Sequence, residues 1–148
     1  MSDTVTYNGS FVYQGDSGNM QLDYVLHPEG MTKMQLDGPR DHFFIRDHLG
    51  NTRVTLTDKN SDLALSTAPD SGEVLQIRDY YPFGLEHPGG FTQDTDNKYL
   101  YNGKELQSDQ VGAGGLGWYD YGARMYDPAI GKWHIVDLLI GKYDELSS

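Results

Sequence analysis

The sequence lacks cysteine, long apolar segments and an excess of positive charge, and each absence excludes a class of protein. With no cysteine among its 148 residues the chain has no disulfide framework, and its redox compartment stays open. No apolar run approaches the ~20 residues of a transmembrane helix, and the N-terminal residues lack the basic and apolar regions of a signal peptide. A formal charge of −11 repels phosphate backbones and anionic lipids. We therefore expect no nucleic-acid partner and no membrane insertion.

Glycine and aromatic residues are plentiful instead. Eighteen glycines and an aromatic content of 12% are poor material for helices and typical of short strands separated by turns. The length fits one domain. We predict an all-β protein of consecutive antiparallel hairpins that pair into a single curved or spiralling sheet, with no long helix between residues 43 and 136.

The clearest hairpin signal lies in residues 115–137. Large residues alternate over 116–125, and apolar and aromatic residues return over 133–136. The intervening turn has an aspartate that accepts hydrogen bonds from following amides, a proline that presets φ and a glycine suited to φ > 0. These turn residues are Asp127, Pro128 and Gly131.

Further strands are predicted along the chain, over residues 5–13, 20–26, 31–36, 41–46, 54–57, 74–81 and 98–101. Residues 31–36 should be an edge strand, because Pro39 follows and proline cannot donate to a ladder. Residues 41–46 should be central, because three apolar residues are consecutive there. Residues 87–97 are predicted to be a loop, and 138–146 one or two helical turns.

Turn residues recur in similar patterns. An acid, a glycine and a base follow one another in Asp47 to Arg53 and again in Asp127 to Lys132, and repeated hairpins stack into a continuous sheet. The residues expected to shape the turns are Asp47, Gly50, Arg53, Pro82, Gly84, Gly103, Pro128 and Gly131.

Four motifs in a fixed order carry a family resemblance. They are residues 47–53, 80–84, 99–105 and 115–133, and together they cover roughly residues 40–137. The sequence resembles the Rhs-repeat-associated core domain of the YD-repeat family of bacterial polymorphic toxins. The resemblance implies N-terminal strands over 1–39, a core over 40–137 with an inserted surface loop at 61–70, and a short tail over 138–148. It also implies a secreted or cell-surface bacterial protein.

The resemblance further implies an aspartyl-type self-cleaving centre, in which two close carboxylates share a proton. The matching residues are Asp127 and Asp137, with Arg124 as the basic neighbour. The family's Asp-Pro is replaced at Asp137 by Asp-Leu, and its Gly-Arg by Gly-Lys at Lys132, which cannot make a bidentate arginine contact. The chain also stops at Ser148, before a second Asp-Pro motif. We therefore expect a C-terminally truncated core that is not an enzyme.

Several functions stay open. The first is a non-catalytic structural domain that closes a toxin-enclosing β-shell, with other YD-repeat segments as partners. The second is a filament or homo-oligomer built from copies of the chain through their edge strands. Self-cleavage and glycan binding by the aromatic residues are alternatives to both, although we favour cross-strand ladders as the explanation of the aromatic pattern. The five histidines form no matched set, so we expect no metal and no cofactor.

Overall fold

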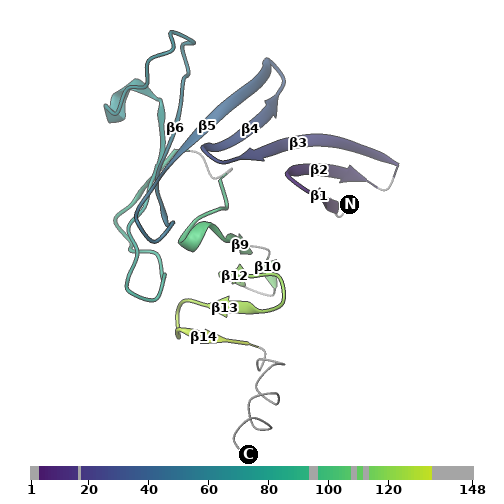
Figure 1. Ribbon diagram of the computed structural model, residues 1–148, viewed down its shortest axis with the longest axis vertical. Helices are drawn as coiled ribbons and strands as arrows, with labels where there is room; N and C mark the ends of the chain where they lie inside the picture. Colours follow the sequence, from purple (N-terminus) through teal and green to yellow (C-terminus); the bar gives the residue numbers. More distant parts are fainter. Residues whose placement is uncertain (1–3, 17, 94–96, 108–109, 112–113, 135–148) are drawn as a thin grey trace, which may run out of the picture.

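The computed structural model describes residues 4–16, 18–93, 97–107, 110–111 and 114–134. Nearly all the regular structure of the described residues is β-strand, and these residues contain no α-helix, which confirms the all-β class. The strands form an eight-stranded sheet, a four-stranded sheet and a two-stranded ribbon (Figure 1). The prediction that all the strands pair into a single continuous sheet is therefore wrong.

The eight-stranded sheet is a meander in which every strand pairs antiparallel with the next one along the chain. Its strands are β1 (Thr4–Asn8), β2 (Phe11–Asp16), β3 (Asn19–His27), β4 (Gly30–Gln35), β5 (Gly38–Arg46), β6 (Thr52–Thr57), β7 (Val74–Ile77) and β8 (Phe91–Thr92). The sheet is open, with β1 and β8 as its edges. Short turns join β1 through β6 and keep these consecutive strands adjacent, whereas longer connections lead from β6 to β7 and from β7 to β8.

The predicted strand over 5–13 is in fact the β1–β2 hairpin. Asn8 pairs with Phe11 across a two-residue turn, in which Gly9 has φ +62°. The Gly-Ser pair of this loop is itself a hairpin signal. Apolar and β-branched residues on both sides of it favour a strand, and they concealed the turn.

The predicted edge strand over 31–36 is β4, which lies between β3 and β5. Pro39 does not exclude this arrangement, because it is the second residue of β5 and pairs with Met34 beside the turn. A proline near the start of a strand costs the ladder little. The strand over 41–46 is central, as predicted. The loop predicted over 87–97 contains the short strand β8.

The four-stranded sheet has the order β14-β13-β12-β9, with β9 (Glu105–Gln107), β12 (Trp118–Asp120), β13 (Met125–Asp127) and β14 (Lys132–Trp133). The ribbon pairs β10 (Gln110–Val111) with β11 (Gly114–Gly115). The alternating run over 116–125 is not one strand, because the chain turns between β12 and β13 at Gly122, whose φ is +87°. Residues 135–146 lie outside the described part, including the predicted helical turns.

Residues 98–101 do not form the predicted strand. Tyr99 makes one isolated bridge to Glu105, and a 3₁₀ turn, η2 (Tyr101–Gly103), lies between them. Asn102 and Gly103 have φ of +51° and +64°, the left-handed values of a tight two-residue turn.

Two apolar clusters form the core. The first gathers Val12, Tyr24, Met31 and Phe44 from the large sheet, with Leu26 and Tyr99 packed against them. The second gathers Leu100, Tyr119 and Tyr126, with Tyr80, Tyr101, Leu106 and Tyr121. Consecutive residues Tyr99 and Leu100 belong to different clusters, so this segment joins the two sheets.

Candidate functional site

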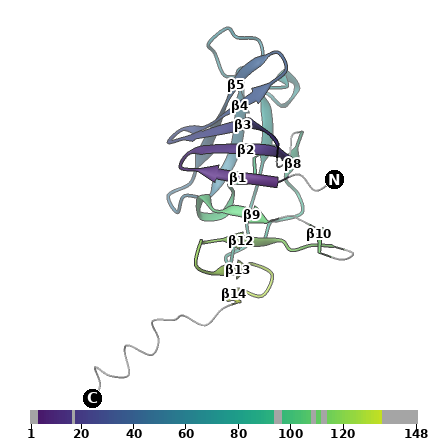
Figure 2. The ribbon, with the colours of Figure 1, turned by 90° about the vertical axis from the view of Figure 1, so that its right-hand side faces the viewer.

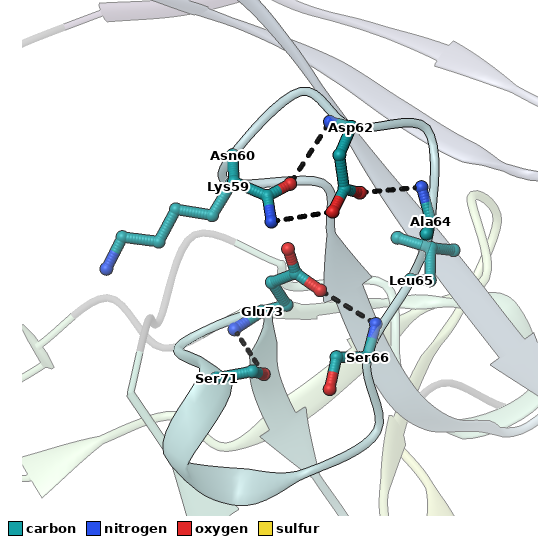
Figure 3. Close-up of a pocket in the computed structure, with 8 residues that line it drawn as sticks. All are labelled: Lys59, Asn60, Asp62, Ala64, Leu65, Ser66, Ser71 and Glu73. Carbon is teal, nitrogen blue, oxygen red and sulfur yellow. Dashed lines mark hydrogen bonds between the residues drawn. The ribbon is translucent and has the colours of Figure 1, made fainter.

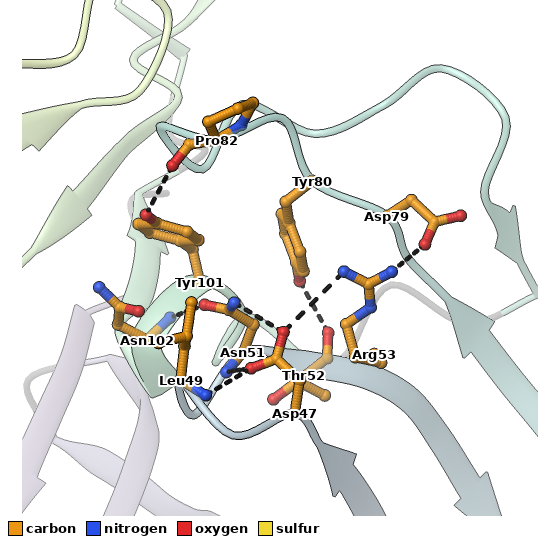
Figure 4. Close-up of polar contacts among 10 residues, drawn as sticks. All are labelled: Asp47, Leu49, Asn51, Thr52, Arg53, Asp79, Tyr80, Pro82, Tyr101 and Asn102. Carbon is orange, nitrogen blue, oxygen red and sulfur yellow. Dashed lines mark hydrogen bonds and ion pairs between the residues drawn. The ribbon is translucent and has the colours of Figure 1, made fainter.

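The turn between β5 and β6 is organised by the carboxylate of Asp47 (Figure 4). Its Oδ1 accepts hydrogen bonds from the backbone N–H groups of Leu49 and Asn51, both at 3.0 Å, and its Oδ2 accepts from Asn51 Nδ2 at 2.8 Å. Burial alone would raise the pKa of Asp47. The hydrogen bonds from Asn51 and Leu49, with the charge of Arg53, outweigh burial and lower that pKa.

The same turn holds the large sheet to the segment that leads into the small one. Asn51 is 4% exposed, and its Oδ1 accepts a hydrogen bond from the Asn102 N–H at 2.8 Å. The Thr52 N–H donates to the carbonyl of Leu100 at 3.0 Å, and the Thr52 hydroxyl donates to the carbonyl of Tyr99 at 2.8 Å. These contacts span about fifty residues of sequence, so a local motif fixes a long-range junction.

Arg53 extends this junction to the chain after β7. Its guanidinium forms an ion pair with Asp79, lies 3.9 Å from Asp47 Oδ2 and stands 5.7 Å from the centre of the Tyr80 ring. The Tyr80 hydroxyl donates to the carbonyl of Thr52 at 2.8 Å. Arg53, the basic residue of the repeated pattern, thus lies between Asp47 of the β5–β6 turn and Asp79, which follows β7.

The turn at Pro82–Gly84 packs against the tyrosines of the small sheet. The hydroxyl of Tyr101 donates to the carbonyl of Pro82 at 3.3 Å, and that of Tyr126 donates to the carbonyl of Phe83 at 2.9 Å. Gly84 has φ +84°, and a Cβ there would lie 2.5 Å from the Tyr101 ring. Only glycine fits this place without a shift.

The predicted turn residues therefore occupy neighbouring turns. Asp47, Gly50, Arg53, Pro82, Gly84 and Gly103 lie around the junction of the two sheets. Pro128 and Gly131 lie in the β13–β14 turn, where a Cβ on Gly131 would stand 3.3 Å from the Phe83 ring. The sequence motifs thus mark contacts between turns.

Asp127, a candidate that the family resemblance implies, has a turn amide and an imidazole as neighbours among the described residues. Its Oδ1 accepts the Ala129 N–H at 2.9 Å, and its Oδ2 lies 3.3 Å from His134 Nε2. The His134 ring stacks on Trp118 with 3.7 Å between centroids. No feature of the sequence singled out His134, because a tight turn has to form before residues 127 and 134 meet.

Of the other two family-matched candidates, one lies in the described part of the chain and one does not. Arg124 places its guanidinium over the ring of Trp133, 4.6 Å from its centre. Asp137 lies outside the described residues. Within the described part, Asp127 therefore has a neighbouring imidazole, and the structure leaves the expected pair of carboxylates untested.

Tyrosines of the small sheet and of the turns beside it form a packed cluster. Tyr101 has ring centroids 5.8 Å from Tyr80, 5.8 Å from Tyr119 and 6.3 Å from Tyr126. Tyr119 is 1% exposed, and burial raises the pKa of Tyr80 and Tyr119 above the usual range of a phenol. The rings pack against one another, as the cross-strand interpretation requires.

A carboxylate on β9 ties β1 to the small sheet. The Tyr7 hydroxyl donates to the two oxygens of Glu105 at 2.8 and 3.0 Å, and Figure 2 shows β9 following β1 in the stack of strands. Tyr99 also donates to Glu105, at 3.4 Å, and its hydroxyl lies 3.3 Å from that of Tyr24. Burial raises the pKa of Tyr99 to about 12, and burial together with Glu105 raises the pKa of Tyr7.

The described part of the chain was searched for metal-ligand clusters and for membrane-spanning helices. No group of three or more histidine, aspartate or glutamate side chains is gathered there around one point. None of its helices has the length and apolar character needed to cross a bilayer.

The ordered hairpins and the packed turns are similar to the fold of an Rhs/YD-repeat toxin complex. Three of the similar solved structures are TcdB2-TccC3-Cdc42, with a TM-score of 0.63 over 92% of this chain, TcdB2-TccC3-TEV, with 0.58 over 88%, and TcdB2-TccC3, with 0.57 over 88%. The sequence identity is 18% in each, so the likeness concerns the fold.

This chain spans only 6% of the length of the chains that it matches. No protein-family model matches the sequence, and no curated protein does.

Proposed function

We propose that this chain is a structural, non-catalytic segment of a YD-repeat β-shell, and that its edge strands pair with neighbouring YD-repeat strands. The open meander of eight strands, whose edge strands β1 and β8 each pair with only one strand among the described residues, carries the proposal. The likeness to TcdB2-TccC3 over about nine-tenths of the chain supports it. A role in such a shell also suggests export to the cell surface or beyond.

The edges have the properties that strand addition needs. All five residues of β1 are exposed, and so are both residues of β8 and both of β14. In a hairpin with a two-residue turn the flanking pair is hydrogen bonded in both directions. Asn8, Thr6 and Thr4 therefore direct their N–H groups at β2, and Val5 and Tyr7 direct theirs outward. An unpaired row of this kind accepts another strand.

The surroundings of Asp127 support a structural role. Its carboxylate caps the β13–β14 turn through Ala129 and contacts His134, and both contacts stabilise a tight hairpin. The neighbouring Arg124 stacks on Trp133. These contacts therefore give both side chains a structural role that does not depend on peptide hydrolysis.

Strand addition can be tested with Val5→Pro, which removes an outward N–H and leaves the β1–β2 hydrogen bonds in place. Val5→Thr is the matched control, because it keeps the N–H and the β-branched shape. Backbone hydrogen exchange is measured on the full chain, alone and with a purified YD-repeat protein. In the unsubstituted chain we expect the Val5 and Tyr7 amides to gain protection from exchange only when the YD-repeat protein is present. The amides of Val5→Thr should gain the same protection. In Val5→Pro the Tyr7 amide should gain none.

Two outcomes would contradict this function. Unchanged exchange in the presence of the YD-repeat protein would remove the shell interpretation. Fibres of regular repeat formed by the chain alone, seen by negative-stain microscopy and abolished by Val5→Pro, would favour self-assembly instead.

The non-catalytic part has its own test. The purified chain with a C-terminal extension is incubated and analysed by mass spectrometry, and we expect it to stay intact. A cut that disappears in Asp127→Asn or in Asp137→Asn would show that the chain is a self-cleaving protease.

A further inference from the structure

The tripeptide Tyr-Asn-Gly occurs twice in the chain, at residues 7–9 and again at residues 101–103. Asparagine is a chemically labile residue, and a following glycine makes it most prone to lose its side-chain amide, because glycine has no side chain to shield its backbone nitrogen. Both asparagines have the same two neighbours, so their intrinsic reactivities match closely. A difference between Asn8 and Asn102 in the folded protein therefore comes from their surroundings.

The reaction begins within the chain. The backbone nitrogen of the glycine attacks Cγ of the asparagine and forms a new C–N bond. The side-chain nitrogen then leaves as ammonia, after it has taken up the proton released from the glycine nitrogen. Water, the only co-reactant, opens the resulting succinimide ring at either of its carbonyl groups. One opening gives aspartate, and the other gives isoaspartate, whose backbone is one carbon atom longer.

The second of the two turns holds both reacting groups. Asn102 Nδ2 donates to the Tyr121 hydroxyl at 3.0 Å, and the Asn102 N–H donates to Asn51 Oδ1 at 2.8 Å (Figure 4). The attacking nitrogen is also occupied, because the Gly103 N–H donates to the carbonyl of Leu100 at 3.2 Å. Attack on the Asn102 side chain therefore requires several hydrogen bonds to break together.

The turn between β1 and β2 leaves the corresponding groups unrestrained. Within the described part of the chain, neither the Asn8 side chain nor the Gly9 N–H makes a hydrogen bond. Asn8, Gly9 and Ser10 are all exposed, and Asn8 is the last residue of the edge strand β1. Its backbone pairs with Phe11 at the end of the ladder. The end of an exposed edge hairpin opens at little cost, so Asn8 can rotate into the geometry of attack.

A third exposed asparagine precedes a small residue, and it is restrained as well (Figure 3). Asn60 lies in the connection between β6 and β7, which contains the 3₁₀ turn η1 (Pro69–Ser71). Its Nδ2 donates to Asp62 Oδ2 at 2.9 Å, and its Oδ1 accepts the Asp62 N–H at 3.1 Å. Of these three asparagines, Asn8 is the one whose amide is not held.

We propose that Asn8 is a site of spontaneous deamidation, and that its isoaspartyl product loosens the β1–β2 hairpin. Asn8 pairs with Phe11 directly beside the turn, so an extra backbone atom there shifts Thr6 away from its ladder partner. Deamidation also adds a negative charge to a chain whose formal charge is already −11. The edge strand thereby carries a chemical record of the age of the protein.

The test is prolonged incubation of the full chain in mildly alkaline buffer, followed by peptide mapping with mass spectrometry. Conversion is measured at Asn8 and Asn102 in the same folded sample and in a second sample unfolded in guanidinium chloride. We expect Asn8 to be converted at least about tenfold faster than Asn102 in the folded chain, and the two rates to be similar in the unfolded chain. Similar rates in the folded chain, or a difference that persists after unfolding, would contradict the proposal.

Two variants examine the causes separately. Tyr121→Phe keeps the ring and removes the oxygen that accepts from Asn102, so it should speed conversion at Asn102 about two- to tenfold. An unchanged rate would show that these hydrogen bonds do not protect Asn102, and the comparison with Asn8 would fail.

Freshly prepared Asn8→Asp adds the charge without the longer backbone, and it is the matched control for the isoaspartyl fraction of an aged sample. Hydrogen exchange at the Thr6 amide, which faces β2, should be faster in the isoaspartyl fraction than in Asn8→Asp. Equal protection of this amide in the two samples would show that the modification does not loosen the hairpin.

Discussion

The contact between Gly84 and the Tyr101 ring allows a sharp test of how the turns are packed. Replacing Gly84 with alanine places a Cβ 2.5 to 2.6 Å from three ring atoms of Tyr101. The ring has little room to move, because it packs against Tyr80, Tyr119 and Tyr126. We therefore expect Gly84→Ala to destabilise the fold by two separate effects.

The two effects have different sizes. An alanine held at φ +84° costs about 1–2 kcal/mol relative to glycine. Overpacking against a ring that cannot retreat costs about 1–3 kcal/mol more. Gly122 is a matched control, because its φ is +87° and nothing lies within 4 Å of its added Cβ. Gly122→Ala should therefore cost only the backbone term.

Urea denaturation followed by tryptophan fluorescence measures both variants, because Trp118 and Trp133 lie in the small sheet, and Trp133 packs on Tyr126, a neighbour of the Tyr101 ring. We expect Gly84→Ala to be less stable than Gly122→Ala by about 1–3 kcal/mol, a midpoint lower by roughly 1 M. Truncating Tyr101 to leucine should remove most of that difference. Equal stability of the two alanine variants would refute the packing argument.

Two further predictions follow from the titrating groups. The pKa of Asp47 is lowered in the folded protein, so ionised Asp47 stabilises the fold above about pH 4, and this stabilisation is lost as the pH falls through the folded pKa. Urea denaturation of the unsubstituted chain and of Asp47→Asn measures the effect. The difference in their free energies of unfolding should shrink between about pH 5 and pH 2. A constant difference would show that ionisation is irrelevant there. The pKa of Tyr99 is raised to about 12 in the folded protein, and that of Tyr24 is also raised. The neutral phenols therefore stabilise the fold fully below about pH 10, and this stabilisation is lost as the pH rises through the folded pKa values. Phenolate absorbance should therefore rise together with unfolding in alkali, and a titration of all 11 tyrosines near pH 10 in the folded state would contradict this.

The sequence predicted features that depend on a few adjacent residues. Asn102-Gly103 adopts the left-handed angles of a tight turn, and the central strand containing Phe43 and Phe44 lies where its apolar run required. Predictions failed where one glycine interrupts an alternating pattern. Gly9 and Gly122 each divide an expected strand in two, because alternation alone does not distinguish one long strand from a hairpin.

The remaining features depend on contacts between distant residues. Whether β4 is central or at an edge is decided by its neighbours, and its own residues do not encode this. The split into two sheets follows from the segment around Tyr99 and Leu100, which contributes to both apolar clusters. The pairing of Asp127 with His134 needs a formed turn, and that of Tyr7 with Glu105 crosses 98 residues. Such partners cannot be inferred from local periodicity.

The bond between Tyr7 and Glu105 also bears on how the protein is made. Each strand of the large meander pairs with the strand just before it, so this sheet can grow hairpin by hairpin as the chain emerges from the ribosome. The hydrogen bond from the Tyr7 hydroxyl can form only after Glu105 has been synthesised, 98 residues later. During that interval β1 is held by β2 alone, and its contact with the small sheet forms last.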